Sequence, residues 1–421
     1  MTLPESERHP AFAGSEEVIA PLPRITLQAF CETPAVAAAM QAVVADRRMD
    51  KAHARIQMGG PAAAVEAFRA APTPNIIVLE TVSDPATLVA NLDALSESCD
   101  AGTKVVVIGH VNDVQLYRDL IRRGVSEYLI APLETLDVLR TLSELYVSAE
   151  ARNLGRIIAV TGAKGGVGAS TVAHNIAWAI AGGLGASTVV VDLDIAFGTA
   201  GLNFNQDPPQ GIAEAIFAPE RLDANLLDRL LSRCSDNLAL LAAPAMLDRT
   251  IDLGEDALEQ LLDLLRSSVP CIVLDVPHQW SAWVKRTMLG ADEILIVAEP
   301  ELASLRNAKN FVDLARAARP NDAGARLVLN KVGVPKRPEI APPEFAKTLG
   351  IEVLSTIPFE AQLFGTAANN GQMIAEVQAG SKANEAFAQI AGTLTGRGET
   401  RRGRRSLLEP LVSKLKRRKA S

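Results

Sequence analysis

Aromatic residues are scarce in this chain, at 4% of 421 residues, so aliphatic side chains and alanine must fill its cores. Its four cysteines are widely scattered without metal-ligand spacing, which favours reduced thiols: Cys31, Cys99, Cys234 and Cys271. The start lacks the basic and apolar segments of a signal peptide, and no apolar run approaches the roughly 20 residues of a membrane-spanning helix. We therefore predict a cytoplasmic protein.

Charge is shared unevenly along the chain. The net charge is −7, but residues 397–421 hold ten Lys or Arg against two Glu, a net of +8 that leaves −15 for the rest. Apolar residues of this tail recur at helical spacing beside the basic ones: Leu407, Leu408, Leu411, Val412 and Leu415. Pro410 restricts such a helix to a start near Glu409. The pattern predicts reversible contact with an anionic membrane surface; a solvated terminus and a nucleic-acid-binding tail are the alternatives.

Changes in composition divide the chain into five segments. We predict a flexible lead-in over 1–23, an α/β domain over 24–148 and a linker over 149–156. A second α/β domain is predicted over 157–395, followed by a basic, amphipathic tail over 396–421.

Runs rich in β-branched residues predict buried parallel strands in both α/β domains. In the first domain they are 24–30, 75–80, 104–109 and 127–132. In the second they are 157–160, 188–192, 238–241, 271–276, 293–298, 326–330 and 353–358. Helices are predicted between strands, such as 34–45 and 114–123, the latter capped by Asp113 and stopped by Gly124. Both domains are thus expected to be open, mainly parallel sheets.

A glycine-rich loop joins the strand 157–160 to a predicted helix over 170–181. Its glycines let successive backbone N–H groups face a phosphate at the positive end of the helix. Ser170 at the helix start has a hydroxyl suited to a magnesium ion. This strand–loop–helix context favours phosphate binding over an ordinary glycine turn.

Two positions of the loop depart from the common phosphate-loop pattern. Ala169 replaces the lysine that precedes the Ser, and Ala163 replaces the first glycine. Loss of the lysine removes a positive charge from the β- and γ-phosphates, which predicts weaker binding and slower hydrolysis. Lys164 compensates in part if it reaches the phosphates.

Three aspartates lie at the ends of predicted strands. Asp192 and Asp194 are two residues apart, so we expect them to point the same way from one strand end. Asp275 follows the apolar run 271–274. With Ser170, these carboxylates predict a magnesium site; each aspartate could instead cap a neighbouring helix.

The sequence Lys164-Gly165-Gly166 resembles the deviant Walker A motif of the MinD/ParA ATPase superfamily. The resemblance implies a P-loop NTPase fold, ATP and Mg²⁺ as cofactors, and a nucleotide-sandwich homodimer in which Lys164 reaches the partner's nucleotide. Asp194 would position the attacking water, and Asp275 would contact the metal through water, beside Ser170 and Asp192. The nucleotide would be held by Ala163, Lys164, Gly165, Gly166, Val167, Gly168, Ala169, Ser170 and Thr171. Asn330 and Pro358 end later strands where the superfamily binds adenine, although ordinary turn chemistry is the alternative.

A narrower resemblance is to the CpaE/TadZ pilus-assembly branch. It is carried by Asp275-Val276-Pro277-His278-Gln279-Trp280, by Ala169, by the run 194–202 and by the additional α/β domain in front. The alternative for His278 and the tryptophans is ordinary packing. This resemblance implies a localisation and assembly factor for the tight-adherence (Flp, type IVc) pilus secretion machinery, placed in the cytoplasm, at the inner membrane or at a cell pole. Its implied partners are the secretion ATPase and the inner-membrane platform proteins.

The front domain resembles the receiver (flavodoxin-like) fold of two-component regulators. A receiver needs an acidic pair after its first strand, yet this stretch reads Phe30-Cys31-Glu32-Thr33. The phosphate-accepting position falls at Glu80, and the lysine after the fifth strand is Ala131. We interpret the domain as a pseudo-receiver, with Glu80 alternatively a simple exposed residue at a strand end.

Other functions stay open at this point. A ParA-like partitioning ATPase would position cargo through DNA or membrane, although Ala169 and the front domain argue against it, and we do not expect a nucleic-acid partner. A signalling module with a working receiver is opposed by the missing acidic pair and lysine.

Overall fold

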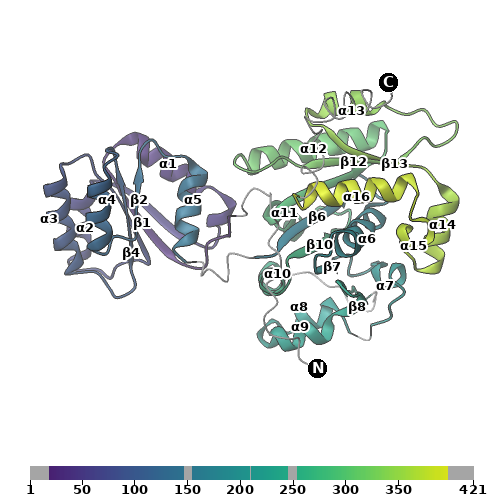
Figure 1. The fold of residues 1–421 in the computed structure, drawn as a ribbon, viewed down its shortest axis with the longest axis horizontal. Helices are drawn as coiled ribbons and strands as arrows, with labels where there is room; N and C mark the ends of the chain where they lie inside the picture. The colour runs from purple at the N-terminus through teal and green to yellow at the C-terminus, as the bar shows by residue number, and fades with distance from the viewer. Residues whose placement is uncertain (1–18, 147–153, 209, 245–253, 397–421) are drawn as a thin grey trace, which may run out of the picture. The chain divides into compact units, whose positions relative to one another are not determined.

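The computed structural model describes residues 19–146, 154–208, 210–244 and 254–396, and these form two units (Figure 1). The first contains residues 19–146 together with the short segment 319–322, and the second contains the remaining described residues. The predicted basic tail and most of the predicted lead-in and linker lie outside the described residues.

The first unit is a five-stranded parallel sheet with strand order β2-β1-β3-β4-β5. Its strands are β1 (Thr26–Cys31), β2 (His53–Met58), β3 (Ile76–Glu80), β4 (Lys104–Gly109) and β5 (Glu127–Ile130). Its helices are α1 (Pro34–Val44), η1 (Arg47–Met49), α2 (Gly60–Phe68), α3 (Pro85–Ser96), α4 (Val114–Arg122) and α5 (Thr135–Glu144). This is the doubly wound order of the flavodoxin-like fold, which confirms the receiver-like prediction.

Helix α4 begins and ends as its sequence predicts. Asp113 accepts hydrogen bonds from the backbone N–H groups of Gln115 and Leu116, which satisfies two donors of the first turn. Gly124 follows the helix with a φ of +95°, a left-handed conformation that favours glycine.

The second unit is an eight-stranded sheet with strand order β13-β12-β11-β6-β10-β7-β9-β8. Its strands are β6 (Arg156–Gly162), β7 (Thr188–Asp192), β8 (Ser232–Ser235), β9 (Leu238–Leu241), β10 (Cys271–Asp275), β11 (Glu293–Ala298), β12 (Arg326–Val332) and β13 (Val353–Pro358). Strand β8 pairs antiparallel with β9, and the other pairings are parallel.

Helices cover both faces of this sheet (Figure 1). They are α6 (Ala169–Trp178), η3 (Ala179–Gly183), α7 (Ala200–Asn203), α8 (Ile212–Phe217), η4 (Pro219–Arg221), α9 (Ala224–Leu230), α10 (Glu255–Ser268), α11 (Ala282–Gly290), α12 (Leu302–Ala318), α13 (Pro342–Leu349), α14 (Ala361–Asn370), α15 (Ile374–Gln378) and α16 (Lys382–Leu394).

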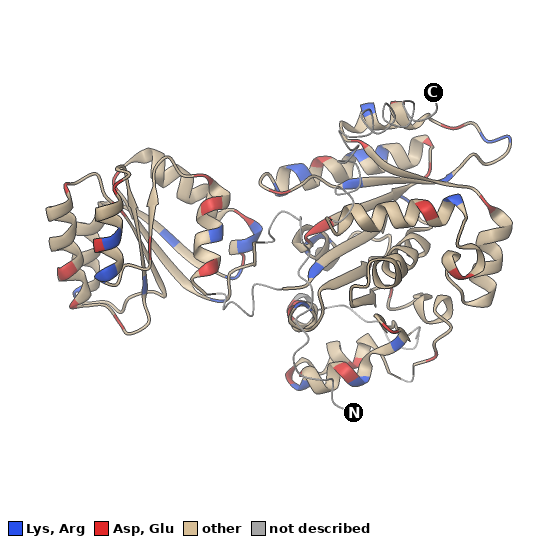
Figure 2. Cartoon of the chain, in the orientation of Figure 1, with Lys and Arg blue, Asp and Glu red and all other residues tan. Residues whose placement is uncertain are grey.

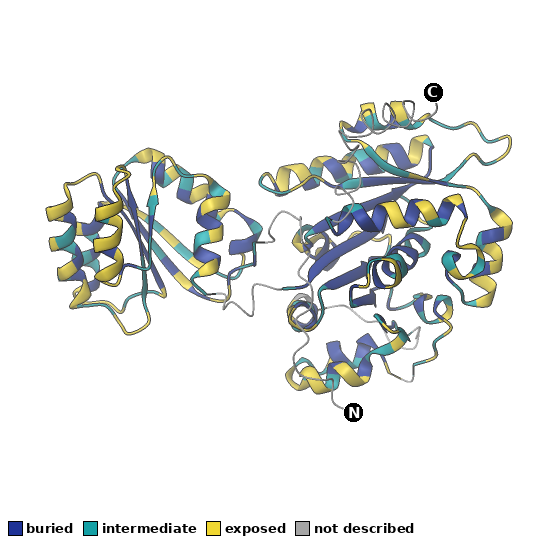
Figure 3. Cartoon of the chain, viewed as in Figure 1, coloured by how far each residue is buried: buried dark blue, intermediate teal, exposed yellow. Residues whose placement is uncertain are grey.

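Alternation along the strands sends side chains into two separate cores. On β6, Ile157 and Ala159 pack on the face covered by α10 to α13, whereas Ile158 and Val160 pack on the face covered by α6 and α16. Figure 3 shows these strands buried, and Figure 2 shows the charged residues concentrated on helices and connecting segments. Both cores consist mainly of aliphatic residues, as the composition predicts. Burial of each such side chain contributes roughly 1.5–3 kcal/mol.

The strand order brings the predicted site residues to one edge of the sheet. Strand β10 lies between β6 and β7, so Asp275 is in register with Asp192 on one side and with Val160 on the other. Open parallel sheets bind ligands at this edge, beyond the carboxyl ends of the strands. Among the described residues, no helix is both long and apolar enough to cross a membrane.

Candidate functional site

The loop between β6 and α6 adopts the conformation that its glycines allow. Gly166 and Gly168 have φ angles of +81° and +85°, and Gly168 directly precedes Ala169, the first residue of α6. A β-carbon on Gly168 would lie 2.5 Å from the side-chain nitrogen of Asn330, so a larger residue does not fit. A β-carbon on Gly166 would meet open space, and the N-terminus of α6 has no side-chain cap. The loop therefore leaves an open, positively polarised helix end.

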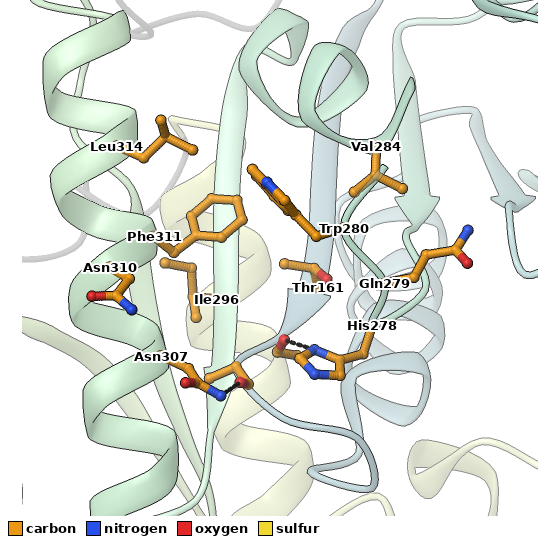
Figure 4. Close-up of a pocket in the computed structure, with 12 residues that line it drawn as sticks. Thr161, His278, Gln279, Trp280, Val284, Ile296, Asn307, Asn310, Phe311 and Leu314 are labelled. Atoms are coloured by element: carbon orange, nitrogen blue, oxygen red, sulfur yellow. Dashed lines mark hydrogen bonds between the residues drawn. The ribbon is translucent and has the colours of Figure 1, made fainter. Parts of the chain in front are cut away.

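Four side chains hold the loop from outside by donating hydrogen bonds to its backbone carbonyl oxygens. The contacts are His278 Nδ1 to Gly162 O (2.9 Å), Asn307 Nδ2 to Ala163 O (2.9 Å), Lys331 Nζ to Gly166 O (2.6 Å) and Asn330 Nδ2 to Val167 O (2.8 Å). Figure 4 shows the first two, from the segment after β10 and from α12. We call these four residues the carbonyl clamp.

The carbonyl clamp determines where the loop's N–H groups point. In a planar trans peptide the N–H is directed opposite to the C=O. With the carbonyls of Ala163, Gly166 and Val167 bound by the clamp, the N–H groups of Lys164, Val167 and Gly168 point away from it. Convergent N–H groups beside a helix N-terminus form an anion site, so this geometry fits a phosphate group.

Lys331 is held against the loop by Glu299. The Lys331 ammonium lies 2.9 Å from one oxygen of Glu299, and Arg337 donates to the other at 2.6 Å. Burial alone would raise the pKa of Glu299, but Lys331, Lys164 and Arg337 outweigh it and hold that pKa below its usual value. Glu299 thus stays ionised and fixes one member of the carbonyl clamp.

Lys164, the predicted nucleotide-contacting lysine, pairs with a carboxylate of its own chain. Its ammonium lies 2.5 Å from Glu301, directly before α12, and this contact raises the lysine pKa. Both side chains are about one-third exposed, so the pair is worth well under 1 kcal/mol and a stronger anion can displace it.

Ala169 stands in the first position of α6 and packs partly against the core on that face. A helix therefore begins one residue earlier than the sequence analysis predicts, and it ends at Trp178, followed by the π-helical turn η3. Ser170 and Thr171 lie half-buried in the first turn of α6, as expected for hydroxyls beside the phosphate loop.

Asp192 and Asp275 are buried together at the ends of β7 and β10. Burial and then repulsion by Asp275 raise the pKa of Asp192 to about 7. Asp192 accepts hydrogen bonds from the N–H groups of Asp194 and Ala200, both at 3.1 Å. Ala200 begins α7, so Asp192 also contacts a helix start, which was the alternative interpretation.

The sequence predicts that Asp192 and Asp194 point the same way because they would alternate along one strand, but only Asp192 belongs to a strand. Strand β7 ends at Asp192, so the alternation of side chains does not extend to Asp194. Asp194 is half-buried instead, and its carboxylate accepts a hydrogen bond from the N–H of Phe197 at 3.2 Å.

This site fits a magnesium ion that is completed by a nucleotide. Two facing carboxylates and a serine hydroxyl supply the hard oxygen ligands that Mg²⁺ prefers, and a cation would offset the repulsion between Asp192 and Asp275. Within the described residues no group of three or more His, Cys, Asp or Glu could hold a metal alone. Mg²⁺ commonly takes only one or two carboxylates and completes its shell with water and phosphate.

The two residues predicted at the base pocket have different surroundings. Asn330 is buried and reaches the loop through its side-chain amide, which belongs to the carbonyl clamp. Pro358 ends β13 at the edge of the sheet, beside Val332 of β12. Asn330 therefore lies at the loop, and Pro358 lies one strand further out.

His174 is a site residue that the sequence analysis missed. It lies on α6, is 1% exposed, and its Nε2 atom is 3.2 Å from a carboxylate oxygen of Asp275. His174 follows Ser170 by four residues, so both lie on one helix face, and this spacing was the available signal. Asn307 and Lys331 of the carbonyl clamp were also missed.

A cavity of about 530 Å³ adjoins the clamp (Figure 4). Trp280 and Phe311 both line it and lie side by side in edge-to-face contact, with ring centroids 5.5 Å apart and nearly perpendicular planes. Trp280 is 56% exposed, whereas Trp283 is buried, so simple core packing explains only the second tryptophan.

In the first unit, Glu80 at the end of β3 is fully buried, so its interpretation as a simple exposed residue is wrong. Its carboxylate accepts hydrogen bonds from the N–H groups of Glu32 and Thr33 (2.7 and 2.8 Å), from the Thr33 hydroxyl (2.6 Å), and lies 3.0 Å from His110 Nε2. Burial alone would raise the pKa of Glu80, but these hydrogen bonds hold it below its usual value. The Glu80 carboxylate therefore occupies the position next to the N-terminus of α1 where an external anion such as phosphate could otherwise bind.

Comparisons with known proteins agree with this geometry. A family model described as an AAA domain matches residues 155–321. The solved pilus assembly protein CpaE from Caulobacter crescentus is 46% identical to this chain over 98% of its own length and 31% of this chain, with a TM-score of 0.30. The chain belongs to the CpaE-like branch of the MinD/ParA family. The sequence identity, rather than the structural score, carries this assignment.

Two further relatives of this CpaE-like chain are MinD proteins. The septum site-determining protein MinD of Helicobacter pylori is 26% identical over 57% of this chain and 90% of its own length. The MinD structure from Pyrococcus horikoshii, complexed with Mg-ADP, is 22% identical over 57% of this chain and 96% of that one, with a TM-score of 0.50. The latter likeness concerns the fold alone, and it confirms the prediction of a P-loop NTPase fold.

Proposed function

We propose that this CpaE-like protein is an ATP-binding localisation and assembly factor for the tight-adherence (Flp, type IVc) pilus secretion machinery. It acts as a nucleotide-linked dimeric scaffold with weak or no hydrolysis. The observation that carries the nucleotide part is the carbonyl clamp, which directs N–H groups of the loop into an open site. The identity with a pilus assembly protein supports the assembly part.

We assign roles to the residues of this site as part of the proposal. The loop 163–171 binds the phosphates of ATP, and Ser170, Asp192 and Asp275 hold Mg²⁺. Bound Mg²⁺ would neutralise phosphate charge and orient the nucleotide. In this proposal Asp194 positions the attacking water, and Asn330 contacts the adenine in addition to holding the loop.

Weak turnover follows from Ala169. An alanine cannot place a charge on the β- and γ-phosphates, so the transition state loses a stabilising contact that most P-loop enzymes make. Lys164 is only loosely held by Glu301 and is available to a nucleotide across a dimer interface.

The decisive experiment measures ATP binding and phosphate release for the full-length chain, Lys164→Ala and Ala169→Lys. We expect slow turnover in the wild type and tighter binding with faster turnover, by roughly tenfold, in Ala169→Lys. Lys164→Ala should reduce the nucleotide-dependent dimer measured by light scattering. Wild-type turnover equal to that of Ala169→Lys would contradict the scaffold proposal.

Location and partners need separate tests. We infer a position in the cytoplasm, at the inner membrane or at a cell pole, with the secretion ATPase and the inner-membrane platform proteins as partners. Removal of residues 397–421 should abolish flotation with anionic liposomes, and unchanged flotation would refute the membrane role of the tail. Salt-sensitive binding to non-specific DNA would instead favour a ParA-like partitioning function.

A further inference from the structure

Helix α7 is joined to both carboxylates of the proposed magnesium site. Its first residue, Ala200, donates its N–H to Asp192 at 3.1 Å. Its last residue, Asn203, donates from its side-chain amide to Nδ1 of His174, also at 3.1 Å. His174 in turn lies beside Asp275. One short helix therefore contacts Asp192 directly and Asp275 through a histidine.

The hydrogen-bond roles define the state of the imidazole. An amide nitrogen can only donate, so Nδ1 of His174 accepts from Asn203 and the ring proton lies on Nε2. This buried Nε2 atom is 3.2 Å from Asp275, yet it makes no well-aligned hydrogen bond among the described residues. A buried donor this close to a carboxylate, without a hydrogen bond to it, can engage once the carboxylate is reoriented.

Packing limits how far this group can move. The His174 ring lies 5.2 Å from the ring of Phe204, the residue that follows α7. At the other end of α7, a β-carbon on Gly198 would lie 2.4 Å from the Asp192 carboxylate, so the chain passes close against that side chain. Helix α7 also directly follows the segment that contains Asp194. A displacement of this segment must therefore reach both buried carboxylates.

We propose that His174 is a positioning residue, which couples the orientation of the Asp275 carboxylate to helix α7 through Asn203. This inference rests on the proposed function, because Asp275 is taken to contact Mg²⁺. His174 itself is not a ligand, because its Nε2 carries a proton and lies 3.2 Å from Asp275. Groups that orient a metal-binding carboxylate commonly change metal affinity by 10- to 100-fold when they are removed.

The test measures the affinity of the full-length chain for a non-hydrolysable ATP analogue, by calorimetry, with Mg²⁺ and with EDTA. The ratio of the two dissociation constants reports the gain from Mg²⁺ alone. His174→Leu should lower this ratio roughly tenfold and Asn203→Ala roughly threefold, with the affinity in EDTA unchanged. His174→Gln should restore most of the ratio because its amide nitrogen can replace Nε2, whereas His174→Asn, which replaces only Nδ1, should not.

Leu202→Ala is the matched control, because Leu202 lies on α7 beside Asn203 but is 73% exposed. A ratio that stays at the wild-type value in His174→Leu and Asn203→Ala, with only a lower melting temperature, would make the role purely structural and overturn the proposal. An independent readout is the ¹⁵N NMR signal of His174, which should report the proton on Nε2. A proton on Nδ1 would overturn the proposed coupling between Asn203, His174 and Asp275. Failure of the wild type to bind the analogue would overturn the proposed function instead.

Discussion

Helix α1 of the first unit and helix α6 of the second both begin just after a parallel strand, yet their N-termini are occupied differently. Helix α1 begins against the Glu80 carboxylate and is capped by the Thr33 side chain. Helix α6 has no side-chain cap, and the nearby side chains bind the loop's carbonyls instead of its N–H groups. The helix N-terminus at the end of the strand is therefore occupied by a carboxylate of the chain in the first unit and is open to an external anion in the second.

This difference lies in which groups meet the positive end of the helix. A helix N-terminus attracts an anion wherever it is exposed at the edge of a sheet. In the first unit an internal carboxylate satisfies that attraction, which leaves little reason for a phosphate to bind. In the second unit the clamp residues strengthen it. The contrast supports the proposed nucleotide site in the second unit.

The largest expected effect on stability comes from removing the Glu80 carboxylate from the N-terminus of α1. Glu80→Ala leaves the partly buried N–H groups of Glu32 and Thr33 without their acceptor, which should destabilise the first unit by roughly 2–3 kcal/mol. Amide hydrogen exchange of β1 and α1 in the intact chain would measure it. Glu66→Ala is the control, since Glu66 is exposed and should change stability by less than about 0.5 kcal/mol. Equal protection in both variants would show that Glu80 is not the group that fills the site.

A second effect concerns the open site. Asn307→Ala removes the donor to the Ala163 carbonyl, so the loop should lose part of its preorganisation and ATP affinity should fall by roughly tenfold. Asn310→Ala is matched to it, because Asn310 lies one turn further along α12 and lines the same cavity. Calorimetric titration should give a change below about twofold for Asn310→Ala. Similar losses of ATP affinity in both variants would mean that the cavity lining, rather than the hydrogen bond to the loop, affects binding.

The smallest effect is a pH dependence of opposite sign in the two units without nucleotide. The pKa of Glu80 is lowered by folding, so its stabilising contribution persists above about pH 4 and is lost as the pH falls below it. The pKa of Asp192 is raised to about 7, so its contribution to stability is fully present below the unfolded pKa of about 4 and is lost as the pH rises from there to about 7.

Calorimetric unfolding of the intact chain at several pH values should resolve this contrast. Asp192→Asn should remove the decline between about pH 4 and pH 7, because an amide does not titrate. Asp194 and Ala200 donate to different oxygens of Asp192, so the single amide oxygen of Asn keeps one of these two hydrogen bonds and the other is lost. A persistent decline in this variant would assign the effect to another group.

Much of the fold could be predicted because its strands carry a strong local signal. The apolar runs at β7, β10 and β11 are buried on both faces, and such runs are typical of central parallel strands. The edge strand β2 was missed because His53–Met58 is largely polar and exposed. Strand β8 was missed because Ser232–Ser235 is short and its antiparallel pairing depends on β9.

The site could be predicted only where the residues follow one another in the sequence. The glycine loop and the strand-end aspartates are local patterns, and the structure brings them to one edge of the sheet. The clamp residue Asn307 lies 144 positions from its partner, and no local pattern reports such a contact. The burial of Glu80 depends in the same way on Thr33, 47 positions earlier. Long-range pairing of polar groups is fixed by tertiary packing, which a single sequence does not display.

The exposed Trp280 beside the clamp has a consequence for optical spectroscopy. All three tryptophans of the chain, Trp178, Trp280 and Trp283, lie in the second unit, and all three tyrosines, Tyr117, Tyr128 and Tyr146, lie in the first. The chain therefore carries one kind of intrinsic fluorophore per unit. Indole emission excited near the red edge of absorption reports only on the loop-bearing unit, while phenol absorbance changes report on the other, without any label or truncation.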